Sequence, residues 1–173
     1  MADGRDGEIH WFSPERRGII PLDGLKISRS LRQTVRKNIF EIRIDTDFEA
    51  VIRCCAERDD VWISESIVES YFRLFRLGYA HSVESWCNGK LVGGLYGVAI
   101  NGAFFGESMF SRETDASKVA LVHLVERLNE RGYSLLDTQY VNPHLTTLGC
   151  IEISKQEYLT RLASALKQEC LFT

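Results

Sequence analysis

The chain has 173 residues, of which 45% are hydrophobic and 26% charged, and a net charge of −3 at pH 7. These values are ordinary for a globular protein with one core, and they exclude a fibrous or low-complexity chain. The first residues are acidic where a secretory signal would be basic, and no apolar run reaches the roughly 18 residues of a membrane helix. We therefore expect a cytoplasmic protein that does not enter a membrane.

The first quarter of the chain predicts a loose arm at residues 1–10 and then a short basic helix. Ser28 or Ser30 is placed to cap this helix. Residues 1–43 carry a charge of +3 (nine Lys or Arg less six Asp or Glu), against −6 for the remainder (twelve less eighteen). The basic helix face is either simply solvated or a surface that binds phosphates, and the pattern leaves both open. Its basic residues are Arg29, Arg32, Arg36 and Lys37.

The next segment predicts a strand and two amphipathic helices. Residues 40–44 alternate between apolar and polar side chains as a strand does. Asp47 opens one helix, and a second helix runs from about Ser64 to Leu77, with Gly78 placed to end it. The side chains expected inside are Phe48, Val51, Ile52 and Cys55 in the first helix, and Ile67, Val68, Tyr71, Leu74 and Phe75 in the second.

The middle of the chain predicts a meander of antiparallel strands. Its first two strands are joined by Asn88-Gly89, a strong signal for a tight hairpin turn. The expected strands are 81–86, 91–98, 103–105 and 107–110.

The last third of the chain predicts a long helix from Ser117, ended by Gly132, and then strands at 134–138 and 150–153. Ser154 and Glu157 form a capping box for a final helix. This order of elements favours an α/β (α+β) fold with a mixed, mostly antiparallel sheet and helices on both faces. In the final helix we expect Leu159, Leu162 and Leu166 to be buried.

The five cysteines predict free thiols. Their number is odd, and they include no C-x-x-C pair, so neither a zinc site nor a disulfide framework is indicated. They are Cys54, Cys55, Cys87, Cys150 and Cys170.

Four polar residues, Asp137, Gln139, Asn142 and His144, follow or end a strand that otherwise reads as buried. An ordinary core strand would not carry them, so we interpret them as part of a functional site. Asp137 and Gln139 are two residues apart on the strand, which predicts side chains on the same face. A purely structural role for Asp137, as a carboxylate that caps a strand end, stays open.

The order of elements is similar to that of the GNAT acyltransferase fold, in which the sheet splays and an acyl donor enters the cleft. GNAT enzymes hold the pyrophosphate of coenzyme A on a glycine-rich turn before the central helix. The corresponding residues here, 111–118, contain no glycine and include Glu113 and Asp115. This composition argues against a backbone nest for a diphosphate, so we expect a donor other than coenzyme A.

Several motifs in the same order resemble the bacterial leucyl/phenylalanyl-tRNA–protein transferase family. The resemblance runs from about residue 9 to residue 162. Members of that family usually begin with a further small N-terminal domain, so we expect a short form in which residues 11–173 make a single GNAT-like catalytic domain. The matching segments are 11–14 (WFSP), 25–30 (LKISRS), 62–63 (WI), 78–84 (GYAHSVE), 91–98 (LVGGLYGV), 106–111 (GESMFS), 116–118 (ASK) and 137–149.

The resemblance implies transfer of Leu or Phe from an aminoacyl-tRNA to a protein with an N-terminal Arg or Lys, which marks that protein for degradation by the N-degron pathway. No metal or cofactor is implied, because the tRNA ester is already activated. The family assigns Asp137 and Gln139 to a relay for the proton of the amine. We interpret Gln139 as positioning the amine while Asp137 supplies negative charge. Glu107 would recognise either the cationic acceptor side chain or the sugar of the donor.

The resemblance also implies the substrate contacts. An apolar pocket would hold the Leu or Phe side chain, aromatic residues would stack on the terminal adenosine of the tRNA, and the basic helix would follow the acceptor stem. Large apolar residues at these positions would serve equally well as core. The substrate-binding residues expected are Leu95, Phe104 and Leu128 for the pocket, Trp62 with Trp11 or Phe12 for the adenosine, and Ser108, Asn142 and His144.

Three other interpretations stay open. A small-molecule N-acyltransferase of GNAT type predicts binding of coenzyme A. A non-catalytic relative that binds tRNA or other RNA predicts RNA affinity that survives Asp137→Ala without any product. A purely structural domain predicts neither property and leaves the polar run at residues 137–144 unexplained.

Overall fold

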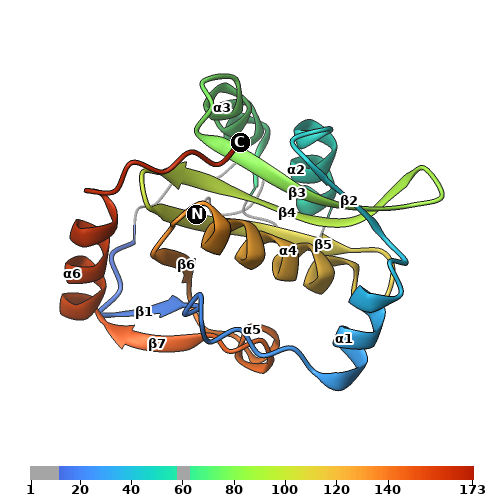
Figure 1. The fold of residues 1–173 in the computed structure, drawn as a ribbon. Coiled ribbons are helices and arrows are strands. Elements are labelled where there is room, and N and C mark those ends of the chain that lie inside the picture. The colour runs from blue at the N-terminus through green and yellow to red at the C-terminus, as the bar shows by residue number, and fades with distance from the viewer. Residues whose placement is uncertain (1–11, 58–62) are drawn as a thin grey trace.

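The computed structural model describes residues 12–57 and 63–173, which form a seven-stranded sheet with helices on both faces (Figure 1). Trp11, Trp62 and the arm expected at residues 1–10 lie outside the described residues. The strands are β1 (Arg16–Ile19), β2 (Glu41–Ile44), β3 (Ala80–Cys87), β4 (Lys90–Ile100), β5 (Ala103–Ser111), β6 (Leu135–Gln139) and β7 (Ile151–Ser154). The helices are α1 (Arg29–Arg36), α2 (Phe48–Ala56), α3 (Glu65–Arg76), α4 (Ala116–Glu130), α5 (Pro143–Thr147) and α6 (Lys155–Ala165).

The strand order is β2-β3-β4-β5-β6-β1-β7, and the β5–β6 pair is parallel while the other pairs are antiparallel. This confirms the expected α/β fold with a mixed, mostly antiparallel sheet. None of the helices in the described ranges has both the length and the apolar character that crossing a membrane would need.

The helices begin where their capping residues predict. In five helices the N-cap side chain accepts a hydrogen bond from the backbone N–H three residues later, which satisfies one free donor of the first turn. These N-cap residues are Ser28, Asp47, Ser64, Asn142 and Ser154. Helix α4 begins one residue earlier than expected, after Asp115, whose backbone is left-handed with φ 66°.

The predicted hairpin is present between β3 and β4. Asn88 and Gly89 both have positive φ, 50° and 73°, as a type I′ turn requires. The expected strands at 103–105 and 107–110 are one continuous strand, β5. The hydrogen-bond ladder between β4 and β5 has a register shift between Tyr96 and Gly97, as at a β-bulge.

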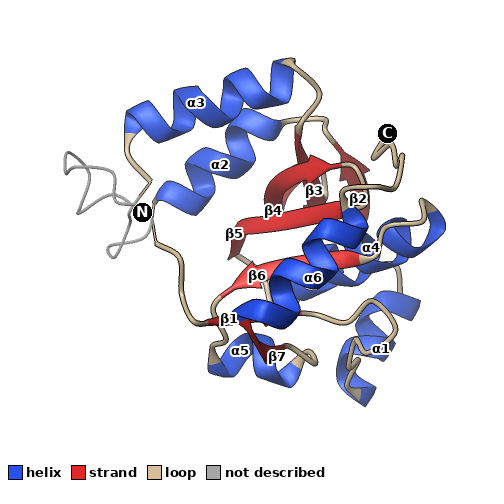
Figure 2. Cartoon of the chain, turned by 90° about the vertical axis from the view of Figure 1, so that its left-hand side faces the viewer, coloured by secondary structure: helices blue, strands red, loops and turns tan. Residues whose placement is uncertain are grey.

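The two faces of the sheet carry separate cores, because consecutive residues of β4 point in opposite directions. Leu95 packs with the residues of α4, and Tyr96 packs with those of α2 and α3. Figure 2 shows these helices on opposite sides of the sheet. Gly93 permits α4 to start directly against β4, since a Cβ there would lie 2.5 Å from the Cβ of Ala116.

The sheet opens between β5 and β6. Their parallel pairing covers three residue pairs and ends at Phe105 and Asp137, whereas β5 continues to Ser111. Past this point no backbone ladder joins residues 106–109 to residues 138–139, and an opening begins between the two strands. The polar run predicted to be functional lies at this opening.

The prediction for the buried face of the last helix was wrong, and two short elements were missed. Leu159 and Leu166 are 51% and 39% exposed, and Leu162 is only half-buried. Helix α6 instead buries Tyr158 and Ala165, because the face that they share with Leu162 packs on β1, β6 and β7. The sequence patterns also gave no indication of β1 or of the short helix α5.

Candidate active site

Asp137 is the centre of a buried polar network at the end of β6. Its side chain is 0% exposed, and donors from three parts of the chain hold the carboxylate. Arg17 of β1 donates from Nη2 at 2.7 Å and from Nε at 3.0 Å, and the hydroxyl of Tyr158 on α6 donates at 2.7 Å. The backbone N–H of Gln139 donates at 2.7 Å. The negative charge of Asp137 is therefore matched by a guanidinium and by two further donors.

A close approach of two backbone segments places Arg17 beside Asp137. Strand β1 lies between β6 and β7, and Gly18 is opposite Gln139. A Cβ at Gly18 would lie 2.8 Å from the carbonyl carbon of Tyr140, so only glycine allows β1 to pack here. Burial alone would lower the pKa of Arg17, but the hydrogen bonds and charge of Asp137 more than offset this and raise it.

Tyr158 completes the support of Asp137. Burial raises the pKa of the Tyr158 hydroxyl, and the negative charge of Asp137 raises it further. The phenol therefore keeps its proton near neutral pH and acts as a hydrogen-bond donor to the carboxylate. Arg17 and Tyr158 were not identified from the sequence. The only available signal was the membership of Arg17 in a basic region, which pointed to phosphates and not to Asp137.

Gln139 leaves the extended conformation that the strand pattern predicts. Its φ of 64° is left-handed, which is unfavourable for a residue other than glycine and is found preferentially at functional sites. The bend lets its backbone N–H reach Asp137 while its side-chain Nε2 donates to Oε2 of Glu107 at 3.0 Å. Asp137 thus fixes the backbone of Gln139, and Glu107 fixes the amide.

Glu107 lies half-buried on β5, across the opening from Asp137. Burial raises the pKa of Glu107, and the charge of Asp137 adds to the rise. Hydrogen bonds from Tyr71 and Gln139 offset part of this effect. The result is a carboxyl group that takes up a proton more readily than an exposed glutamate.

A cavity of about 260 Å³ adjoins Glu107 and contains both apolar and polar side chains. Three of the expected substrate-binding residues, Leu95, Ser108 and Asn142, line it. Phe104 and Leu128 are fully buried in the core instead and are not among the lining residues. The lining comprises Cys55, Ile63, Leu95, Tyr96, Gly106, Glu107, Ser108, Met109, Leu121, Leu124, Leu136, Thr138, Asn142 and Leu145.

Leu121, Leu124 and Leu136 were missed as pocket residues for a physical reason. On α4 and β6 their spacing is that of ordinary core positions, and burial against the sheet and burial against a cavity require the same residue types. Only the opening of the sheet beyond Phe105 distinguishes the two situations.

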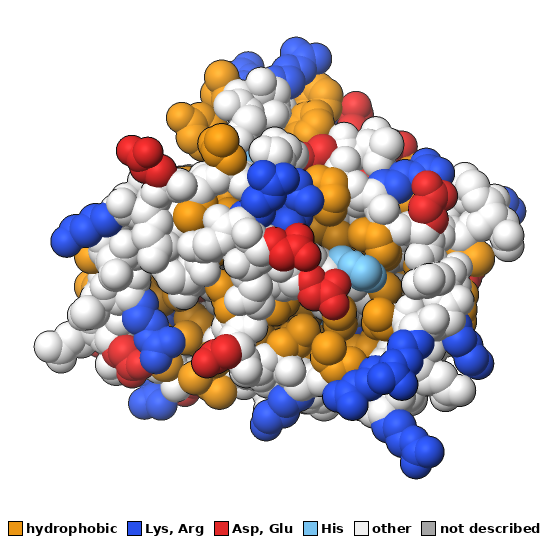
Figure 3. All heavy atoms as spheres, viewed as in Figure 1, with side chains coloured by type: hydrophobic (Ala, Val, Ile, Leu, Met, Phe, Trp, Pro, Cys, Tyr) orange, Lys and Arg blue, Asp and Glu red, His pale blue; other side chains and the backbone are white. Residues whose placement is uncertain are grey.

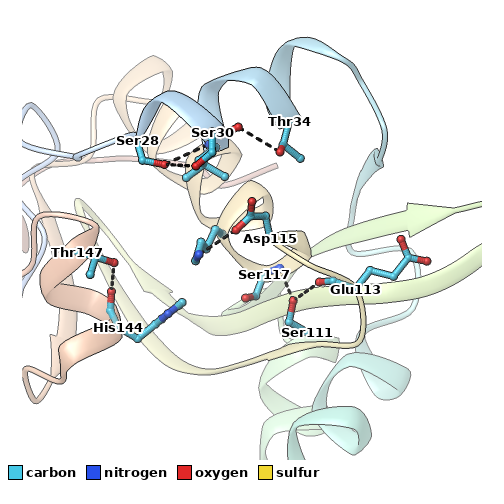
Figure 4. Close-up of polar contacts among 11 residues, drawn as sticks. Ser28, Ser30, Thr34, Ser111, Glu113, Asp115, Ser117, His144 and Thr147 are labelled. Carbon is cyan, nitrogen blue, oxygen red and sulfur yellow. Dashed lines mark hydrogen bonds and ion pairs between the residues drawn. The ribbon is translucent and has the colours of Figure 1, made fainter.

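A second hollow of about 750 Å³ shares Met109 and Asn142 with the first. The side chain of Asn142 caps α5 by accepting from the backbone N–H of Leu145 at 2.8 Å. His144, on the same helix, is exposed and points toward the turn between β5 and α4 (Figure 4). Burial of the ring and the charge of Lys118 lower the pKa of His144.

The basic helix face lies apart from the cavity. Arg29, Arg32, Arg36 and Lys37 are all exposed on or next to α1. Figure 3 shows basic side chains gathered in the region where Figure 1 draws α1. Phe12 is 59% exposed. Because Trp11 and Trp62 lie outside the described residues, stacking of aromatic residues on the adenosine stays a prediction.

Two further observations concern the metal-binding residue types. None of the five cysteines, which all lie within the described residues, is in a disulfide. Within residues 12–57 and 63–173, no cluster of three or more His, Cys, Asp or Glu side chains has the arrangement to hold a metal ion.

Comparison with known sequences adds to this geometry. The family model described as leucyl/phenylalanyl-tRNA protein transferase matches residues 19–163. The leucyl/phenylalanyl-tRNA–protein transferase of Gloeobacter violaceus is 54% identical over 172 residues, which is 99% of this chain and 89% of that protein. The protein of the same name from Paramagnetospirillum magneticum is 54% identical over 177 residues, with 99% of this chain and 85% of that protein covered.

Solved structures show likeness in fold. The structure of L-PGS from Bacillus licheniformis has a TM-score of 0.50 and 13% identity, and the match covers 76% of this chain and 47% of that one. An aminoglycoside acetyltransferase from an uncultured soil metagenomic sample has a TM-score of 0.48 and 14% identity, with 75% and 88% covered. The likeness to L-PGS concerns the fold alone.

Proposed function

Because the chain belongs to the leucyl/phenylalanyl-tRNA–protein transferase family, and so transfers an aminoacyl group from aminoacyl-tRNA to the N-terminus of a protein, we propose that its acceptors begin with Arg or Lys. The observation that carries this proposal is Glu107. Among the described residues that line the cavity, it is the single carboxylate, and no Lys, Arg or His accompanies it. Such a lining favours a cationic partner beside Glu107. The product would enter the N-degron pathway for degradation, and the expected site of action is the cytoplasm.

The donor side chain fits the apolar part of the cavity. Leu95, Leu121, Leu124 and Leu136 bring aliphatic surface from both β4 and β6 and from α4. Burying a Leu or Phe side chain there contributes roughly 1.5–3 kcal/mol of binding free energy. The ester carbon of the aminoacyl group would then lie toward the polar end, where Glu107 and Thr138 line the same cavity.

Gln139 is placed to hold the attacking amine. Its Nε2 donates to Glu107, so its Oε1 is left to accept a hydrogen bond from an amine N–H. Glu107, whose pKa is raised by burial, would take the proton that the amine must lose before it attacks the ester. This assignment differs from the interpretation in which Asp137 supplies the negative charge, because Arg17 already balances that charge.

Asp137 would act as a positioning residue. It holds the backbone of Gln139 in the left-handed conformation, while Arg17 and Tyr158 fix the carboxylate itself. The basic face of α1 would bind the phosphate backbone of the tRNA without regard to sequence. These roles need neither a metal nor a coenzyme, because cleavage of the ester drives the transfer.

The test is transfer of radiolabelled Leu from Leu-tRNA to a model protein in three versions, with N-terminal Arg, Lys or Ala. We expect label on the Arg and Lys versions and none on the Ala version. Equal labelling of all three versions would contradict the proposed acceptor specificity. Binding of tRNA without label on any version would instead support the non-catalytic RNA-binding alternative.

A further inference from the structure

Tyr96 is a buried polar residue that lines the cavity and that has none of the roles proposed above. It lies on β4, its side chain is 0% exposed, and it lines the cavity together with Glu107. Its hydroxyl is the one buried side-chain polar atom, among residues 12–57 and 63–173, that has no hydrogen-bond partner. A buried hydroxyl without a partner is unfavourable, and native proteins rarely keep one without a reason.

The ring of Tyr96 is held firmly in this position. Phe48 and Tyr71 both contact it edge to face, with centroid distances of 5.9 Å and 5.3 Å. Tyr71 in turn hydrogen-bonds to Glu107. Tyr96 is therefore one aromatic ring away from the carboxylate proposed to act on the amine. These aromatic contacts restrict the rotamers of the Tyr96 side chain.

We propose that Tyr96 is a further catalytic residue, whose hydroxyl donates a hydrogen bond to the carbonyl oxygen of the donor ester. This inference rests on the proposed site and names a contact that completes it. The carbonyl oxygen of the ester can only accept hydrogen bonds, and a phenol hydroxyl can donate one. Burial raises the pKa of the Tyr96 hydroxyl well above its usual value, so the phenol keeps its proton and can only assist by donating.

The hydrogen bond would matter most during the transfer itself. The nitrogen lone pair of the acceptor forms a bond to the ester carbon, and the carbonyl π electrons move onto the oxygen. When this tetrahedral intermediate collapses, the C=O bond forms again and the bond to the ribose oxygen breaks. Glu107 gives the ribose oxygen the proton that it took from the amine. It then accepts the second proton, which the new amide nitrogen must lose, and releases it to solvent. Tyr96 stabilises the negative oxygen throughout without giving up its proton.

The experiment compares Tyr96→Phe with Tyr133→Phe in the transfer assay with N-terminal Arg acceptors. Tyr133 is also buried, but it packs near the C-terminus on Phe172, away from the cavity. Each variant loses one hydroxyl and keeps its ring. We expect kcat to fall about 100-fold in Tyr96→Phe with little change in KM for Leu-tRNA, and to stay unchanged in Tyr133→Phe.

The stability of the variant is a second measurement. If Tyr96 had only a structural role, loss of its hydroxyl would lower the midpoint of urea unfolding. The midpoint of urea unfolding should not fall in Tyr96→Phe, because the lost hydroxyl makes no hydrogen bond in the free protein. If wild-type protein transfers Leu and Tyr96→Phe does so equally well, the inference is wrong while the proposed function stands. A rise in KM alone would also overturn it, since that result would mean ground-state binding only. An inactive wild type would overturn both.

Discussion

Two glutamates of the sheet are surrounded by protein in different ways. Glu84, on β3, is 0% exposed, and both of its oxygens have partners within the fold. Oε1 accepts from the backbone N–H of Asp47 and from the hydroxyl of Ser82, each at 2.8 Å, and Oε2 accepts from the indole of Trp86 at 2.9 Å. This carboxylate ties the hairpin strand β3 to the start of α2, and it leaves no acceptor for a ligand.

Glu107, on β5, is the opposite case. It is half-buried at the opening of the sheet, shares hydrogen bonds with Tyr71 and Gln139, and lines a cavity that also contains the unpartnered hydroxyl of Tyr96. We infer from this comparison that the closed polar network of Glu84 supports the fold, and we propose that the open network of Glu107 serves the substrate. The experiments below and the Tyr96 variant above test this distinction.

The largest effect is expected for Asp137→Asn. The variant loses the negative charge that pairs with Arg17. Its new side-chain NH2 group must also face a hydrogen-bond donor, which weakens the hydrogen bonding that fixes the backbone of Gln139. Transfer should fall on the order of 1000-fold in kcat. Breaking a buried ion pair should also lower the free energy of unfolding by about 3–5 kcal/mol. Single-turnover transfer at low temperature and urea unfolding measure the two effects separately.

A positioning role for Asp137 also requires that the folded variant still bind aminoacyl-tRNA. Its Kd for a non-reactive aminoacyl-adenosine amide should stay within a few-fold of wild type while kcat collapses. Full transfer activity in folded Asp137→Asn would remove Asp137 from the site.

Glu107→Gln should lower kcat/KM at neutral pH by about 100-fold, because the amine loses its proton acceptor. The glutamine keeps an oxygen that can accept from Gln139, so the local geometry survives. Unlike the Asp137 variant, this one should unfold at a urea concentration no lower than wild type at pH 7. A large loss of stability with normal kcat would mean that Glu107, like Glu84, supports the fold and takes no part in the transfer.

The pH dependence of the wild type follows from the raised pKa of Glu107. Activity should decline on the acid side as pH falls through that raised pKa, above the usual glutamate value of 4.5, and this limb should be absent in Glu107→Gln. Between the usual and the raised pKa, the folded state binds more protons at Glu107 than the unfolded state does. The contribution of Glu107 to stability therefore decreases as pH rises through this window. Paired pH profiles of kcat/KM and of urea unfolding measure both.

Glu84→Gln should lower the stability of the protein and leave the rate of transfer unchanged. The amide would present a donor to the indole N–H of Trp86 or to the donors on the other side, and one buried group would lose its partner. We expect the free energy of unfolding to fall by about 1–3 kcal/mol with kcat unchanged in the folded fraction. A tenfold drop in kcat without loss of stability would show that the contrast between the two glutamates is wrong.

The smallest effect is expected far from both carboxylates, on α1. Arg32→Gln should weaken tRNA binding a few-fold and lower the slope of log K against log salt concentration by about 1, as the loss of one phosphate contact does. Arg73→Gln, an exposed residue of α3 on the other side of the sheet, is the matched control and should leave the slope unchanged. Equal slopes in the two variants would leave α1 as an ordinary solvated helix face.

Those features that depend on neighbouring residues were predictable from the sequence. The N-caps Ser28, Asp47 and Ser64 and the Asn88-Gly89 turn satisfy local hydrogen-bond and backbone requirements, so a few residues suffice to identify them. The family could also be predicted from the sequence, because its motifs are short, occur in a fixed order and are spread over most of the chain.

The remaining features depend on distant contacts. Strand β1 has four residues and no alternation, and it becomes a strand only because β6 and β7 flank it. The support of Asp137 by Arg17 and Tyr158 and the left-handed bend at Gln139 follow from that placement. Likewise, α6 turns its Tyr158 face and not its leucines toward the sheet, because the hydrogen bond to Asp137 and the packing of Ala165 decide its rotation.

The position of β1 sets when the active site forms during synthesis. Arg17 is among the first described residues to be made, yet its partner Asp137 is 120 residues later in the chain, and Tyr158 follows after that. A contact of such sequence separation forms late, because a long loop must be closed first. Until the ribosome has released the segment through Tyr158, Asp137 lacks its partners and Gln139 its bend. Under the roles proposed above for Asp137 and Gln139, a growing chain would not yet transfer the aminoacyl group.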